Sequence, residues 1–129
     1  MIISGVLSIK GSPARVLKAW REGKFEVVVS PQLLGELRRA LAYPKLRARI
    51  SEVDARALVS WVSQAGVNVD EPERQSSIRS NDPGDDYLIA LAAANNAVLV
   101  SGDQHLLELK DRIPVYASAD FLKLVEAEG

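Results

Sequence analysis

Carboxylates stand at three points of the sequence where a folded chain could use them for chemistry. Glu36 lies one turn into a predicted helix that follows an apolar run. Asp85 and Asp86 stand at the start of another predicted helix, and Asp103 follows a second apolar run. Each acid taken alone is more typical of a helix cap, because a negative charge in the first helical turn stabilises the helix by roughly 0.3–1 kcal/mol. Their recurrence at similar places favours a shared site.

A gathered set of carboxylates predicts a bound cation, because the like charges repel and each would lose hydration. Mg²⁺ or Mn²⁺ is the natural ion, since these hard cations prefer oxygen ligands and keep several waters. Either ion could align a water with a phosphodiester and neutralise the charge that develops during displacement. The acids therefore favour metal-assisted phosphodiester hydrolysis.

Short apolar segments alternate with helical patterns along the chain. Ser30 before Pro31, and Ser51, are typical helix N-caps, and Ser12 before Pro13 repeats the first pattern. Predicted helices cover about 12–23, 30–43, 51–66, 85–95, a short stretch to 107 and a last one from 118, and predicted strands cover 25–29, 67–69, 97–100 and 113–116 after an apolar opening. This alternation predicts a parallel sheet with helices on both faces. Sites in such sheets form at the carboxyl ends of the strands.

The composition is that of an ordinary globular chain. Its 129 residues, 47% hydrophobic and 26% charged, fit one compact domain over residues 1–129. The absence of cysteine excludes disulfides and Cys-ligated metals, and a single His excludes a His-rich metal site. No apolar run approaches the roughly 18 residues that span a bilayer, and residues 1–20 lack a signal-peptide pattern, so we expect a cytoplasmic protein without membrane contact. The net charge of −1 gives no global attraction to nucleic acid.

Several other kinds of site lack their residues. The sequence contains no glycine-rich phosphate loop and no Gly-x-Ser-x-Gly elbow. A Ser-His-Asp triad would need His105, and no serine stands on a strand-to-helix elbow to partner it. A phosphoacceptor receiver domain would need paired acids after the first strand and a lysine after the last, and residues 116–118 offer none.

Three blocks of the sequence resemble the PIN-domain family, especially the toxin components of bacterial and archaeal toxin–antitoxin pairs. The blocks are Ser30–Leu37, Asp82–Asp86 with Ala90–Ala92 after it, and Val100–Leu107. Their order and spacing carry the likeness, which runs from about Ile3 to Leu122. The resemblance implies a PIN-like three-layer α/β/α domain with a central parallel sheet. It also implies a Mg²⁺- or Mn²⁺-dependent endoribonuclease that cleaves RNA with a metal-activated water.

The resemblance implies metal-site and catalytic roles for Glu36, Asp85 and Asp103. Asp85 fits the family spacing better than Asp86, which remains a further candidate metal ligand. Ser101 stands where the family often has a Thr or Ser whose hydroxyl holds a metal-bound water or a carboxylate. Ser4, in the opening segment, is a second candidate for a supporting hydroxyl.

One family motif is missing from the opening of the sequence. Family members begin with a strand that ends in Asp-Thr-Asn, and Ile2–Ser8 resembles the segment that follows it. We therefore expect a truncated first strand, a site short of one carboxylate and little nuclease activity in this chain. The alternative is a degenerate, inactive PIN fold that binds RNA or an antitoxin without cleaving.

Five cations and no acid lie between Glu36 and Glu52, namely Arg38, Arg39, Lys45, Arg47 and Arg49. The first four are candidate contacts to RNA phosphates, although such a run is also typical of a solvated helical face. The toxin resemblance further implies a cognate antitoxin and a homodimer. Candidate contact residues of that homodimer are Leu33, Leu37 and Trp61.

Overall fold

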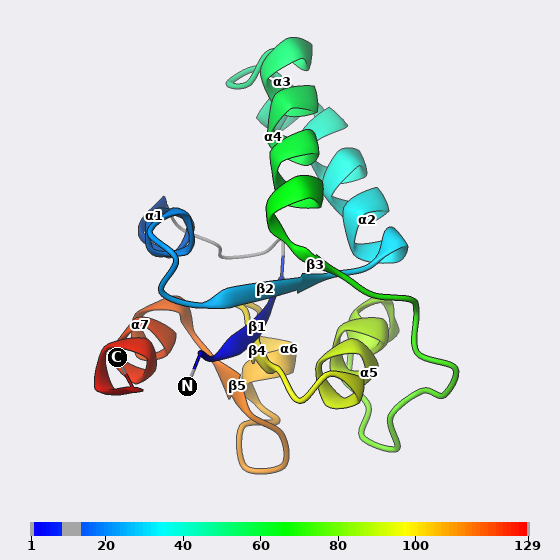
Figure 1. The fold of residues 1–129 in the computed structure, drawn as a ribbon. Helices are drawn as coiled ribbons and strands as arrows, with labels where there is room; N and C mark the ends of the chain where they lie inside the picture. Colours follow the sequence, from blue (N-terminus) through cyan, green and yellow to red (C-terminus); the bar gives the residue numbers. More distant parts are fainter. Residues whose placement is uncertain (1, 9–13, 129) are drawn as a thin grey trace.

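The computed structural model describes residues 2–8 and 14–128, which form a five-stranded, all-parallel sheet and its helices (Figure 1). The strands are β1 (Ser4–Leu7), β2 (Glu26–Val29), β3 (Val67–Asn68), β4 (Val98–Val100) and β5 (Val115–Tyr116), in the sheet order β3-β2-β1-β4-β5. The helices are α1 (Ala14–Arg21), α2 (Pro31–Ala42), α3 (Pro44–Arg47), α4 (Glu52–Ala65), α5 (Asp86–Ala94), α6 (Gln104–Leu107) and α7 (Ser118–Glu128), with a 3₁₀ turn η1 (Pro83–Asp85) before α5. The predicted α/β architecture is confirmed.

Helices cover both faces of the sheet. The chain runs from β1 through β2 to β3 towards one edge, then crosses to β4 and continues to β5 at the other edge. Because parallel crossovers are right-handed, α1 and α2–α4 belong to one face and α5 and α6 to the other. In Figure 1, α1 and α7 stand to the left of the central strands and α5 to the right, with α2, α3 and α4 above them. The direction of winding reverses between β1 and β4, which is where sheets of this kind bind ligands.

The first strand is the central one. Gly5 pairs with Val27 of β2 on one side and with Val98 of β4 on the other. The Ser8 N–H donates to the Val100 carbonyl at 2.8 Å, which continues the ladder past the end of β1. This strand has four residues, the same length as β2, and it joins the two halves of the sheet.

Local signals in the sequence account for several element boundaries. The Ser30 hydroxyl accepts a hydrogen bond from the Leu33 N–H, and the Ser51 hydroxyl accepts one from the Asp54 N–H, so both predicted N-caps are confirmed. The cap predicted at Ser12 lies outside the described residues. Strand β5 lies at a sheet edge, where the preceding Pro114 is accommodated although proline has no N–H to donate to a ladder.

The apolar side chains form two clusters. The main core lies around the sheet, and its largest fully buried members are Phe121, Ile89, Leu91, Leu99 and Leu106. A small second cluster of Leu41, Ala55 and Val59 lies between α2 and α4. At the top of Figure 1, α2, α3 and α4 project away from the sheet, and we call residues 37–59 of this projection the arm. Within the described residues no helix is long and apolar enough to cross a membrane.

Candidate metal centre

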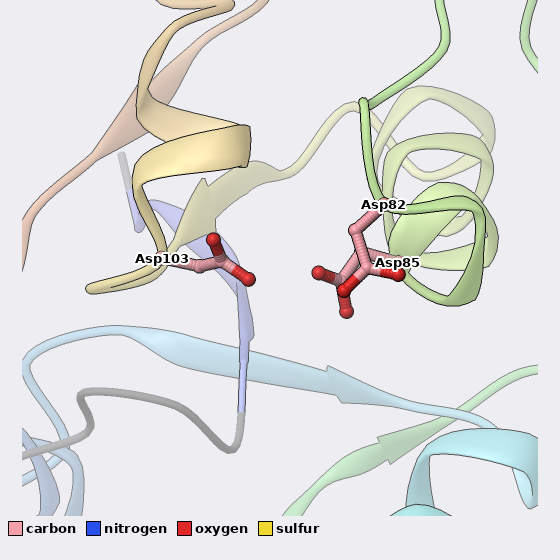
Figure 2. A group of neighbouring side chains, drawn as sticks. All are labelled: Asp82, Asp85 and Asp103. Atoms are coloured by element: carbon pink, nitrogen blue, oxygen red, sulfur yellow. The ribbon is translucent and has the colours of Figure 1, made fainter.

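Three aspartates meet at the carboxyl edge of the sheet. One carboxylate oxygen from each of Asp82, Asp85 and Asp103 lies within 4.8 Å of the other two. Figure 2 shows the Asp103 carboxylate pointing from the start of α6 towards Asp82 and Asp85, which stand together at the turn before α5. All three side chains are half-buried. The group therefore joins the turn after β4 to the turn before α5, beside the switch point between β1 and β4.

Backbone hydrogen bonds orient Asp82. Its Oδ1 accepts from the Gly84 N–H at 3.1 Å, so the side chain caps η1, which begins at Pro83. The Asp82 N–H in turn donates to the Ser80 hydroxyl at 3.1 Å. A Cβ atom at Gly84 would lie only 3.3 Å from Asp82 Oδ1, so the glycine leaves room for this conformation.

Asp103 is held in the same way. Its Oδ1 accepts from the His105 N–H at 2.9 Å and caps α6. Its own N–H donates to the hydroxyl of Ser101 at 2.9 Å, and Ser101 is fully buried. Ser101 therefore fixes the turn that presents Asp103, and His105 contributes through its backbone.

The neighbouring acids Asp85 and Asp86 point to different partners. Asp85 faces the other two aspartates, and its Oδ2 atom is buried. Asp86 is more deeply buried, and its Oδ1 accepts from the Ser80 N–H at 2.8 Å. Its Oδ2 lies 3.5 Å from Arg79 Nη1. Asp86 thus ties residues 79–80 to α5 and stands outside the group of three.

Glu36 is also outside the group of three, on α2, where its carboxylate pairs with the Arg39 guanidinium one turn along the helix. Its charge also acts on Tyr87, in the first turn of α5. The pKa of Tyr87 lies well above its ordinary value, chiefly because the phenol is buried and further because the charges of Glu36 and Asp85 oppose its ionisation. The same tyrosine therefore feels the carboxylates of two separate elements.

The connection after β3 docks on the start of α2. Glu71 Oε2 accepts from the Gln32 N–H at 2.9 Å, and a negative charge at a helix N-terminus is stabilising. Glu71 also contributes to the raised pKa of Tyr87. This contact fixes α2, and with it Glu36, relative to the connection that leads to Asp82.

The donor set suits a hard divalent cation. The oxygens that surround Mg²⁺ lie about 2.0–2.1 Å from the ion, so they are roughly 3–4 Å from one another. The 4.8 Å within which the aspartate oxygens lie is close to this spacing, and small side-chain rotations cover the difference. Backbone N–H groups already orient two of the three carboxylates, as outer partners of metal ligands commonly do.

Sequence reasoning missed two residues at this edge. Asp82 was not a candidate, although an acid before Pro83, three residues ahead of Asp85, is a turn signal that could have indicated it. The second residue is the buried Ser8, which follows the carboxyl end of β1. Ser4, the serine that the sequence suggests, lies at the amino end of that strand, paired with Glu26.

The chain matches the protein family described as the PIN domain, over residues 1–105. No curated protein was found to match it. The matched segment runs from before β1 into α6 and contains all three aspartates of the centre. With most of its length covered, this chain belongs to the PIN domain family.

Proposed function

We propose that this chain is a metal-dependent endoribonuclease in which Asp82, Asp85 and Asp103 hold Mg²⁺ or Mn²⁺. Membership of the PIN domain family gives it a nuclease-type fold, and PIN domains generally use divalent metals. The observation that carries the proposal is the meeting of three carboxylates from two turns at the switch point of the sheet. When bound, the ion would supply positive charge for a phosphodiester and an activated water.

The protein groups of this centre have separable tasks. The N–H groups of Gly84 and His105 fix one oxygen each of Asp82 and Asp103, which orients these carboxylates before any ligand arrives. We assign Glu36 as a fourth acid, which positions the attacking water or accepts its proton. Its pair with Arg39 is solvent-exposed, and exposed pairs contribute little stability, so the carboxylate is available to exchange partners.

The cellular role that we propose is the toxin of a toxin–antitoxin pair. A basic side chain of the antitoxin would cover the aspartates, because their gathered negative charge attracts a cation. We also propose a homodimer. Its contacts must extend beyond the residues named from the sequence, since Leu33 is buried in the main core and Leu37 and Trp61 pack within the protomer.

Cleavage of a fluorescent single-stranded oligoribonucleotide tests the enzymatic proposal. We expect weak cleavage with Mg²⁺ or Mn²⁺, because the central strand supplies no acid to the centre, and none in EDTA. We also expect loss of the cleavage in Asp103→Asn, which keeps the size of the side chain and removes its charge. Full activity in EDTA, or an unchanged rate in that variant, would contradict metal-assisted hydrolysis.

A second candidate function is a non-cleaving PIN fold that binds RNA or an antitoxin. It is favoured by the content of the central strand, since neither β1 nor the following Ser8 supplies an acid to the carboxyl edge. RNA that is bound but left intact in the presence of either ion would select this function.

A further inference from the structure

The arm concentrates positive charge in a chain whose net charge is −1. Two arginines near its base and its outer end are paired within their own helices, Arg39 with Glu36 and Arg56 with Glu52. The remaining cations are exposed, and the structure gives them no ion pair with any acid of the described residues: Arg38, Lys45, Arg47 and Arg49. With six cations against the two acids Glu52 and Asp54, the arm carries an excess of positive charge.

Arg38 and Arg47 line the same groove. This groove measures about 500 Å³ and runs between α2, α3 and α4. Its wall also contains the Glu52–Arg56 pair, polar residues such as Ser60 and Gln64, and the apolar Leu41, Ala55 and Val59. Arg38 also lines a neighbouring groove of about 350 Å³, which passes Pro31 at the start of α2. Arg38 thus connects a groove on the arm to one at the base of α2.

The second groove lies where the start of α2 meets the segment after β3. Its wall includes Asn68 and Asp70, which begin the connection that docks on α2 through Glu71 and continues to Asp82. An extended polyanion lying in both grooves would therefore run from the arm to the amino end of α2.

An exposed aromatic ring accompanies these cations. Tyr43, at the turn between α2 and α3, is 64% exposed. Its carbonyl accepts from the Arg47 N–H at 2.8 Å, so one helical turn separates the two residues. Exposed aromatic rings beside cations are the combination that binds unpaired bases, because any base can stack on the ring.

We infer that the groove lined by Arg38 and Arg47 binds the backbone of single-stranded RNA and that Tyr43 stacks on one of its bases. The inference rests on the proposed ribonuclease function and gives that function a substrate-binding surface outside the metal centre. Charge complementarity selects the occupant, because arginine forks match phosphate oxygens and three of the four charged side chains that line the groove are arginines. An unpaired strand is selected by the exposed ring, since paired bases offer no free face.

Fluorescence anisotropy of a labelled oligouridylate, in EDTA so that the probe stays intact, tests the surface. Arg38→Gln/Arg47→Gln should weaken binding about 10- to 30-fold near 0.1 M salt and reduce the slope of log affinity against log salt by about 1.4, because two phosphate contacts are lost. Tyr43→Ala should weaken binding about fivefold or more, and Tyr43→Phe should bind like the unaltered chain.

Arg15→Gln/Arg112→Gln is the matched control, because it removes the same charge from exposed positions on α1 and on the turn before β5. We expect it to change affinity less than about threefold, as distant charges are screened. Equal losses in the two double variants would overturn the inference in favour of a net-charge effect. Tight binding of duplex RNA, or an unchanged affinity in Tyr43→Ala, would overturn the single-strand assignment.

Other outcomes separate this inference from the proposed function. If Arg38→Gln/Arg47→Gln binds the probe as the unaltered chain does, the surface is wrong, while metal-dependent cleavage would still support the nuclease. If that variant keeps RNA affinity but loses self-association in sedimentation, the groove is a contact between copies and the inference fails. Displacement of the probe by oligoglutamate at equal concentration would show an acidic-peptide site instead. Failure of the unaltered chain to bind the probe also overturns it.

Discussion

Adjacent acids at the start of α5 have different surroundings. Asp86 accepts the Ser80 N–H and lies near Arg79, whereas Asp85 faces Asp103 across the carboxyl edge. The sequence predicts that Asp85 and Asp103 meet. Asp103 follows a strand and Asp85 stands at the start of a helix, and in a parallel sheet with helices both positions belong to the edge where sites form. The family resemblance favours Asp85 over Asp86 by its spacing, but the residues alone do not show which neighbour turns inward, because that depends on Ser80, whose N–H binds Asp86. Asp82 is not predicted either, because its orientation depends on the same turn, in which its N–H donates to the Ser80 hydroxyl.

Amide substitutions at the three aspartates should each weaken Mn²⁺ binding roughly tenfold or more, because affinity follows the number of ligand charges. The variants are Asp82→Asn, Asp85→Asn and Asp103→Asn, and the measurement is isothermal titration of the metal. Asp111→Asn, an exposed acid in the turn after α6, is the control and should bind like the unaltered chain. Equal Mn²⁺ affinity in all four variants would show that the metal does not bind at this centre.

Asp86 should matter more for stability than for metal. Asp86→Ala leaves the buried Ser80 N–H without its acceptor, which costs about 1–3 kcal/mol in the free energy of unfolding. Asp86→Asn retains an acceptor oxygen and should lose less. Urea unfolding measures both, and Mn²⁺ titration completes the comparison: a larger loss of Mn²⁺ affinity in Asp86→Asn than in Asp85→Asn would show that the two acids have been assigned the wrong way round.

At the scale of elements, caps and turns place the helices that carry the acids. The serine caps of α2 and α4 could be predicted, since cap chemistry is local. The four-residue α3 could not, because one helical turn after Pro44 shows no periodicity. The sequence also does not show how closely the end of α4 packs against β2. A Cβ atom at Gly66 would lie 2.9 Å from both methyl groups of Val29 and from the Val62 carbonyl oxygen.

Gly66→Ala should therefore destabilise the protein by about 1–3 kcal/mol, because β2 and α4 must separate to admit the methyl group. Gly35→Ala is the matched control inside α2, where the new Cβ would lie at an ordinary 3.7 Å from the Arg39 guanidinium. It should stabilise the protein by roughly 0.5–1 kcal/mol, since glycine is the poorer helix former. Urea unfolding of both variants gives the comparison, and equal stabilities would refute the steric argument.

The whole molecule has one large core and one small one. The first half of α2 contributes Leu33 to the main core, whereas Leu41, near its other end, belongs to the small cluster with Ala55 and Val59. The parallel sheet and its main core follow from the apolar strand segments and could be predicted. The separate arm could not, because the apolar spacing of α2 is the same along both halves, and only the tertiary arrangement shows which half leaves the sheet.

An arm with so small a core should open by itself, at a free energy below that of global unfolding. Leu41→Ala, which deletes a buried side chain of that core, should speed amide hydrogen exchange in α3 and the first turns of α4. Leu41→Ala can lower the free energy of global unfolding by no more than the free energy that opens the arm. Once the arm is open, the contacts that the substitution deletes are already absent. Leu99→Ala on β4, equally a buried leucine, should cost about 2–5 kcal/mol and speed exchange throughout the sheet. Hydrogen-exchange mass spectrometry distinguishes the two patterns, and uniform acceleration by Leu41→Ala would mean that the arm and the sheet unfold as one unit.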